Sequence, residues 1–151
     1  TAGSECLIYQ FVSDLFGNAR YFNGVDTTVS ASSIPSISAS NDFSLSFYVV
    51  TGRDVNSIQG LIGNFLSSEN RFQCCISGGD IITSFYTTSY IRTKYVPIEA
   101  NTSYFVEISQ SGTTLSLTVN GVVGLTGTRS QSRSSRQFTI GCLASTTSYF
   151  I

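Results

Sequence analysis

An Asn-Gly pair between two alternating segments is the feature that most constrains the fold of this chain. Residues 103–123 read SYFVEISQSGTTLSLTVNGVV, and Asn120-Gly121 stands near the end of this stretch. Asn-Gly is the strongest short hairpin signal, because both turn residues need a positive φ. Before it, apolar and polar residues alternate with the period of two that a pleated strand requires. A slip of one residue would turn every leucine outward, so the sequence predicts one fixed register.

Short strands are predicted along the rest of the chain, and no segment has the period of a helix. Turn signals separate them at about 8–12 residues, which is typical of a β-sandwich. Charged residues make up only 11% of the chain, against about 25% in typical globular domains. We therefore predict an all-β protein in which residues 1–151 form a single domain. The predicted strands are 5–12, 19–22, 25–30, 43–50, 59–66, 71–77, 81–87, 90–96, 104–109, 114–119, 122–123, 137–143 and 148–151.

The segment from Phe43 to Val50 alternates strictly and is predicted to be a central strand, with its apolar residues facing inward. The Ser-rich segment 31–41, the segment 51–57 and the segment 127–136 are predicted to be loops.

Three segments stand in the order ARYFNGVD (19–26), DFSLSFYV (42–49) and GTTLSLTVNGV (112–122). Together they resemble the concanavalin A-like, laminin-G-like jelly-roll superfamily, and the resemblance covers most of the chain. It implies a jelly-roll β-sandwich of two antiparallel sheets. It also implies a lectin-like binding function, with ligands at the rim loops, as in laminin-G-like domains.

The four cysteines are predicted to form two disulfides. Cys74 and Cys75 are adjacent, so they should face opposite sides of a strand. Cys74 shares its predicted strand face with apolar residues, and so does Cys142. We therefore expect the pairs Cys74–Cys142 and Cys6–Cys75. A redox or metal site is the alternative, but the chain has no CxxC motif and no histidine, which argues against zinc.

The absence of histidine excludes a Ser-His-Asp or Cys-His site and a histidine general base. Glycoside hydrolases need two carboxylates on either side of the scissile bond. The nine acidic residues are scattered here, with no E-x-D or D-x-D pair on a predicted strand. We expect a protein that is not an enzyme, although two acids distant in sequence could still meet.

No cofactor is implied, but calcium is possible because it binds carboxylate and amide oxygens in loops. The candidate loop ligands are Asp54 with Asn56, Glu69 with Asn70, and Gly79-Asp80, and the simpler interpretation is that they form turns. The metal-binding pattern of legume lectins is not visible.

Three arginines, Arg129, Arg133 and Arg136, lie in one Ser-rich loop. Arginine binds carboxylates and sulfates through two parallel hydrogen bonds, so the loop could hold an anionic group. The alternative is a solvated loop whose charges maintain solubility.

Aromatic residues that alternate with cations suggest a second candidate surface. Tyr90, Arg92 and Lys94 are predicted to share one strand face. A tyrosine can stack on a sugar ring while neighbouring polar groups bind its hydroxyls. Most such aromatics instead pack in the core. The chain also lacks the histidine and tryptophan of galectins.

We expect a mature, secreted protein. The chain begins at Thr1, contains no Met, has an even number of cysteines, and carries one N-glycosylation sequon at Asn101. The net charge of −1 gives no general attraction to nucleic acid. No apolar run approaches the roughly 20 residues of a membrane span.

The function expected from these features is that of a carbohydrate-binding lectin that binds glycans and forms a homo-oligomer for avidity. The alternative is an extracellular adhesion module that binds a protein or a sulfated glycan through the arginine loop. A glycan-active enzyme is the weakest alternative.

Overall fold

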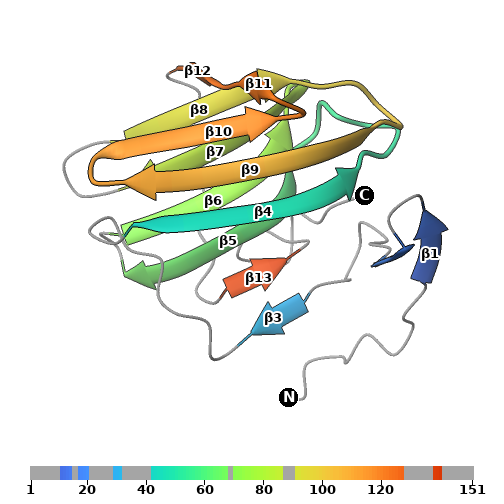
Figure 1. The fold of residues 1–151 in the computed structure, drawn as a ribbon, viewed down its shortest axis with the longest axis horizontal. Coiled ribbons are helices and arrows are strands. Elements are labelled where there is room, and N and C mark those ends of the chain that lie inside the picture. Colours follow the sequence, from blue (N-terminus) through green and yellow to red (C-terminus); the bar gives the residue numbers. More distant parts are fainter. Residues whose placement is uncertain are drawn as a thin grey trace.

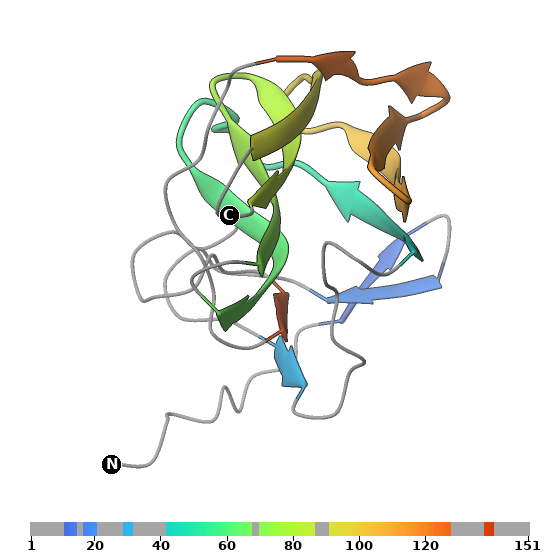
Figure 2. The same ribbon diagram turned by 90° about the vertical axis from the view of Figure 1, so that its left-hand side faces the viewer.

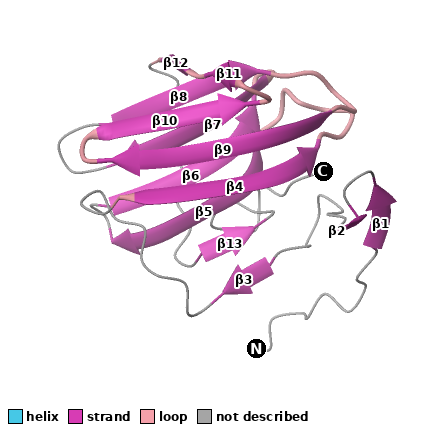
Figure 3. Cartoon of the chain, in the orientation of Figure 1, coloured by secondary structure: helices cyan, strands magenta, loops and turns pink. Residues whose placement is uncertain are grey.

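The computed structural model describes residues 11–14, 17–20, 29–31, 42–67, 70–86, 91–127 and 138–140, and all regular structure within these ranges is β-strand (Figure 3). Alternating side chains and Gly or Asn turns explain this content. The strands are β1 Phe11–Asp14, β2 Gly17–Arg20, β3 Val29–Ala31, β4 Phe43–Val50, β5 Gln59–Ser67, β6 Asn70–Ser77, β7 Asp80–Tyr86, β8 Ile91–Pro97, β9 Ser103–Ser111, β10 Thr114–Val119, β11 Val122–Val123, β12 Leu125–Thr126 and β13 Phe138–Ile140.

Two antiparallel sheets form the two layers of a sandwich (Figures 1 and 2). The four-stranded sheet has the order β11-β10-β9-β4, and the seven-stranded sheet has the order β12-β8-β7-β6-β5-β13-β3. The strands β1 and β2 pair separately as a small hairpin. The predicted all-β sandwich of two antiparallel sheets is therefore confirmed.

The strands on both sides of Asn120-Gly121 keep the predicted faces of β10. Across this turn, Val119 of β10 pairs with Val122 of β11. On its other side, β10 pairs with β9, where Leu117 pairs with Ile108 and Val119 with Val106. Asn120 has a φ of 47° and Gly121 a φ of 79°, as a tight turn that matches the strand twist requires. All the inward residues of β10 are buried, so the hydrophobic pattern and the turn select the same register.

The core lies between the two sheets and is built from both. Phe43 of β4 contacts Phe72 of β6 edge to face, with ring centroids 5.3 Å apart, so aromatic packing joins the layers. Phe72 and Phe85 are completely buried, and each such side chain contributes about 1.5–3 kcal/mol through burial. The buried members of this core are Val49, Val55, Leu61, Ile62, Phe72, Cys74, Ile76, Ile81, Phe85, Val96, Ile98, Val106, Ile108, Leu115, Leu117 and Val119.

The strand β4 has the predicted bounds and the predicted inward face, but its predicted central position is wrong for the sheet as described. It pairs with β9 over its whole length and ends the four-stranded sheet on that side. The alternation of apolar and polar residues predicted the correct face because it reflects burial on one side of the strand. It carries no information on how many neighbouring strands the strand has.

Side chains join β4 to its neighbours at both ends. At its start, the Asp42 carboxylate accepts hydrogen bonds from the Gly112 N–H (2.8 Å) and the Ser111 hydroxyl (3.3 Å). Beyond its end, the buried Thr51 hydroxyl donates to the Glu99 carbonyl (2.8 Å) and accepts from the Thr102 N–H (3.0 Å). These contacts bridge residues far apart in sequence, so they hold the four-stranded sheet as one rigid surface.

Several of the sequence predictions are tested only in part. The hairpin of β5 and β6, the turn into β7 and the end of β8 at Pro97 all agree with the predicted segments. The predicted strand 5–12 and the last two predicted strands extend outside the described residues. Loop 51–57 is confirmed, and most of 31–41 and 127–136 lies outside the described residues.

Candidate carbohydrate-binding face

The outer face of the four-stranded sheet is exposed and consists largely of hydroxyl groups. Because side chains alternate across a strand, the residues between the buried ones point away from the core. We call this surface the outer face. Its members are Ser44, Ser46, Tyr48 and Val50 of β4, Ser103, Phe105, Glu107, Ser109 and Ser111 of β9, Thr114, Ser116 and Thr118 of β10, and Val123 of β11.

Two aromatic rings lie together at one end of this face. Tyr48 pairs directly with Phe105 across β4 and β9, and their ring centroids are 4.6 Å apart. Tyr48 is 54% exposed, so most of its ring remains open to solvent. Exposed aromatic surface beside polar groups makes this end of the face a candidate binding site.

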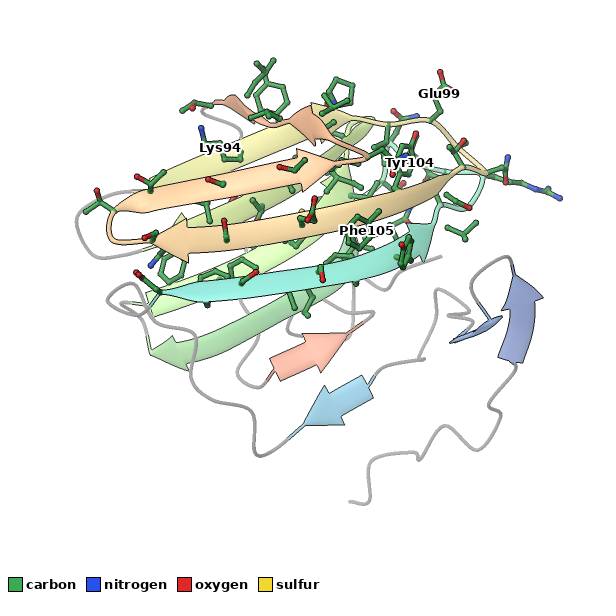
Figure 4. All side chains as sticks on the ribbon, viewed as in Figure 1. Lys94, Glu99, Tyr104 and Phe105 are labelled. Atoms are coloured by element: carbon green, nitrogen blue, oxygen red, sulfur yellow. The ribbon has the colours of Figure 1, made fainter. Side chains whose placement is uncertain are left out.

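The Asn120-Gly121 turn, which joins β10 to β11, fixes the position of Phe105. The Phe105 N–H donates to the Asn120 Oδ1 (2.7 Å), and the Asn120 N–H donates to the Phe105 carbonyl (2.9 Å). The Asn120 Nδ2 also donates to the Ser103 carbonyl (3.4 Å). Figure 4 shows Phe105 near the C-terminal end of β4. These bonds fix the backbone at Phe105, which is one side of the aromatic pair.

Polar groups form the next row of the outer face. Ser46, Glu107 and Thr118 are consecutive cross-strand partners on β4, β9 and β10. They lie two residues along each strand from the aromatic pair, which is about 7 Å. Within the described residues, no hydrogen bond or ion pair engages these three side chains. Their donors and acceptors are available to a ligand stacked on Tyr48.

Glu107 is the acidic residue of this row, and it is exposed. An ionised carboxylate only accepts hydrogen bonds, and its two oxygens can accept from two neighbouring hydroxyls. The flanking hydroxyls of Ser46 and Thr118 can donate or accept. This arrangement can bind a polyhydroxylated molecule through several cooperative hydrogen bonds.

Two of the loops predicted to hold calcium ligands lie side by side. The Gly78 N–H donates to the Asn56 carbonyl (2.9 Å), and the Gly79 N–H donates to the Val55 carbonyl (2.8 Å). These bonds place the loop of Asp54 and Asn56 against the turn before Asp80. Among the described residues, however, no three acidic or cysteine side chains gather in a way that could hold a metal. Asp80 is only 4% exposed and has interactions of its own.

Asp54 has a clear structural task in its own loop. Its Oδ1 accepts from the N–H groups of Asn56 (2.8 Å) and Ser57 (3.1 Å), and its carbonyl accepts from the Gln59 Nε2. A hydrogen bond from the Ser57 side chain, followed by these backbone bonds, lowers the pKa of Asp54. This geometry matches the turn-forming interpretation of Asp54.

The predicted cationic sites fall mostly outside the described residues. Arg129, Arg133, Arg136 and Tyr90 are not among them, and for Arg92 the structure describes the backbone in β8 only. Lys94 is partly exposed, and its Nζ donates to the Thr126 hydroxyl (2.6 Å) at the edge formed by β8 and β12 (Figure 4). The arginine loop therefore stays a prediction from the sequence.

The adjacent cysteines face opposite sides of β6, as predicted. Cys74 belongs to the core between the sheets, and Cys75 packs with Ile82 and Tyr95 on the other face. Both are buried free thiols in the structure. Burial raises the pKa of both, to about 12 for Cys75. Cys6 and Cys142 lie outside the described residues, so the two predicted disulfides stay predictions.

The sequon asparagine lies on an exposed turn at the end of the sandwich. Asn101 has a φ of 52°, and its N–H donates to the Gly52 carbonyl (3.0 Å). Nearby, the Glu99 N–H donates to the Tyr104 hydroxyl oxygen (2.7 Å), which holds the start of β9 (Figure 4). Asn101 is exposed, as a glycosylation site must be.

Comparison with known proteins does not assign a family. No protein-family model and no curated protein sequence matches this chain. Across the described ranges, the structure contains no helix that could span a membrane.

The outer face was missed by reasoning from the sequence, which expected ligands at the rim loops. A signal was present. Tyr48 and Phe105 stand at outward positions of alternating strands, where serine and threonine otherwise predominate. Alternation can place each ring on the solvent side of its strand, but only the pairing of β4 with β9 shows that the two rings are neighbours.

Proposed function

We propose that the protein is a secreted, non-catalytic carbohydrate-binding protein whose ligand lies on the outer face of the four-stranded sheet. The observation that carries this proposal is the pair of exposed Tyr48 and partly buried Phe105 beside the row of Ser46, Glu107 and Thr118. The pair offers an apolar surface, and the row offers hydrogen-bonding groups at a fixed distance from it.

A sugar ring fits this combination better than most other ligands. The C–H groups of a pyranose form an apolar side that can pack on an aromatic ring, while its hydroxyls extend from the rim. On the outer face, those hydroxyls would reach the neighbouring row. The rigid sheet supplies this arrangement without ordering a loop, which reduces the entropic cost of binding.

Chemistry on the ligand is not part of the proposal. The chain has no histidine, and the sheet strands bring only Glu107 to the centre of the face. Hydrolysis of a glycosidic bond needs a second carboxylate about 5–9.5 Å from the first. The residues directly opposite Glu107 on the neighbouring strands are Ser46 and Thr118, and neither has a carboxylate.

Oligomerisation is proposed as the source of avidity. A single exposed face of this size binds one sugar weakly, and linked sites raise the overall affinity. The strand β4 is the edge of the four-stranded sheet as described, and edge strands can pair with a second chain. Sedimentation at several concentrations tests this part separately.

A glycan array tests the proposal directly. The wild-type protein should bind a defined set of glycans above background, and a Tyr48→Ala variant of unchanged thermal stability should lose that binding. An array with no binding at any glycan, with and without calcium, would refute the function. Binding that Tyr48→Ala leaves intact would refute this face as the site.

A further inference from the structure

The outer face has an uneven charge, which bears on which glycans it can take. None of the residues of β4, β9, β10 and β11 is a lysine or an arginine. The exposed carboxylate of Glu107 stands at the centre of the face. A second carboxylate, Asp42, lies at the start of β4 and accepts two hydrogen bonds from the β9–β10 turn.

Glu107 lies within reach of any sugar stacked on the aromatic pair. It follows Phe105 by two residues on the same side of β9, and its direct partners Ser46 and Thr118 are neutral. Directly opposite side chains have Cβ atoms about 4.5–5.5 Å apart, so all three contact the same part of a ligand. No described cation in this row neutralises the carboxylate.

We propose that the outer face selects neutral glycans and rejects those that carry carboxylate or sulfate groups, and that Glu107 determines this specificity. The inference rests on the proposed function. A neutral sugar donates its hydroxyl protons to the Glu107 oxygens, whereas an anionic group is repelled and leaves the carboxylate without a donor. Two charges a few ångströms apart near a protein surface repel strongly enough for about tenfold discrimination or more.

One described cation could oppose this selection. Arg53 is exposed and lies three residues beyond Val50, in the loop that follows β4. It stands at the aromatic end of the face, so an acidic ligand attracted by Arg53 would approach Tyr48 from the loop. The arginine loop 127–136 is a second possible source of anion binding. The experiment must therefore separate the face from both.

The test compares matched glycans on one array, each neutral glycan beside its sialylated and sulfated forms. The wild-type protein is expected to bind neutral glycans at least about tenfold better than their acidic forms. Glu107→Gln keeps the size and the hydrogen-bonding capacity of the side chain but removes its charge, so this ratio should approach one. Glu99→Gln is the control, because Glu99 is an exposed acid in the loop before β9 and away from the row.

Salt supplies a readout that a purely structural role of Glu107 would not change. The Debye length is about 8 Å at 0.15 M and about 3 Å at 1 M salt. The preference for neutral glycans should therefore shrink at high salt in the wild type and stay constant in Glu107→Gln. A preference that is independent of salt and of Glu107→Gln would overturn the inference.

The remaining outcomes are distinct from one another. Equal or better binding of acidic glycans would overturn the selectivity and leave carbohydrate binding intact, and Arg53→Ser would then identify whether Arg53 is the cause. No glycan binding at all would overturn the proposed function and this inference together. A stable dimer that Tyr48→Ala dissociates would assign the outer face to self-association and also overturn both.

Discussion

Tyr48 of β4 and Phe105 of β9 are direct cross-strand partners whose ring centroids lie 4.6 Å apart on the solvent side of the four-stranded sheet. The two residues are 57 positions apart in sequence (105 − 48), and one side of the pair is placed by the hydrogen bonds of Asn120. The relationship concentrates apolar surface at a single point of a face that is otherwise rich in hydroxyls.

Removal of either aromatic ring should weaken glycan binding and leave the fold intact. Tyr48→Ala and Phe105→Ala each remove stacking surface, at a cost of about 1–2 kcal/mol in binding, or about five- to thirtyfold in affinity. Tyr48 is largely exposed, so its replacement should change the free energy of unfolding by about 0.5–1 kcal/mol. Calorimetric titration with the best glycan of the array measures the first effect, and urea unfolding measures the second.

Leu125→Ala is the matched control for this experiment. Leu125 is an exposed apolar residue on β12, which belongs to the seven-stranded sheet and not to the outer face. Its replacement should leave affinity unchanged. Equal losses in all three variants would mean that general surface hydrophobicity, and not the ring pair, controls binding.

Asn120 should be important for stability in two separable ways. Asn120→Gly keeps a residue that tolerates a φ of 47° but removes the side-chain bonds to Phe105 and Ser103, which should cost about 1 kcal/mol. Asn120→Ala adds the cost of a left-handed backbone, about 1–2 kcal/mol more. Urea unfolding of both variants measures the difference.

Asn101 provides the comparison for the backbone contribution alone. It has a φ of 52° and is exposed, and the structure gives it a backbone hydrogen bond to Gly52. Asn101→Ala should cost about 1–2 kcal/mol, and Asn101→Gly should cost little. If Asn120→Gly proved as stable as the wild type, the side-chain bonds of Asn120 would have no measurable role.

The buried thiols should make the reduced protein less stable in alkaline solution. Burial raises the pKa of Cys75 to about 12 in the folded state, whereas an unfolded cysteine ionises near about 8.5. The contribution of the buried thiols to the free energy of unfolding is fully present below the pKa of the unfolded state. It is lost as the pH rises towards the pKa of the folded state, because only the unfolded state releases the proton. The free energy of unfolding should therefore fall between about pH 8.5 and 12.

Cys75→Ala should remove part of this pH dependence, while a substitution of the exposed Ser116 should not.

Alkylation under native, non-reducing conditions addresses the disulfides at the same time. Thiols that react only after unfolding agree with buried free cysteines, whereas thiols that never react without a reductant would identify the predicted Cys74–Cys142 and Cys6–Cys75 bridges.

Chelation should leave glycan binding unchanged. The outer face contributes a single carboxylate, Glu107, to its central row, and calcium needs six to eight oxygen ligands. Titration of the same glycan with EDTA and with added calcium checks this. A loss of affinity in EDTA would relocate the site towards the loop of Asp54 and Asn56.

Secretion from a eukaryotic host should attach a glycan at Asn101. Ser103→Ala removes the sequon without altering the left-handed backbone at Asn101, so it is a cleaner variant than a replacement of Asn101 itself. The expected result is a loss of the mass of one glycan, with unchanged thermal stability. Identical masses for the wild type and Ser103→Ala would show that the sequon is not used.

The sequence predicted correctly which face of these strands is buried, but it did not predict which strands lie next to one another. The alternation of β4 and of β9 gave their buried sides, because burial and the period of two are the same physical fact. The edge position of β4 depends on pairing between distant segments, which no local pattern encodes. The same limitation explains the missed site. Tyr48 and Phe105 each look ordinary in sequence, and only the register between β4 and β9 brings them together.

The sequence indicated which loop residues carry oxygen ligands, but it did not indicate what those oxygens bind. Asp54, Asn56 and Asp80 were predicted as loop oxygens, and hydrogen bonds do bring their loops together. The Asp54 carboxylate serves the protein itself, because it accepts from the N–H groups of Asn56 and Ser57 in its own turn. A count of acids and amides in a sequence cannot separate these two uses.

The hydrogen bonds of Asn120 also protect the protein from chemical ageing. An Asn-Gly sequence in an unfolded chain deamidates readily, because the following N–H is free to attack the side-chain amide and form a succinimide. In this hairpin, the amide oxygen is held by Phe105 and the amide nitrogen by Ser103. The same side chain that positions Phe105 on the outer face is thereby withheld from this reaction. Deamidation at Asn120 should consequently track unfolding of the hairpin, so stored protein should lose the turn and the placement of Phe105 together.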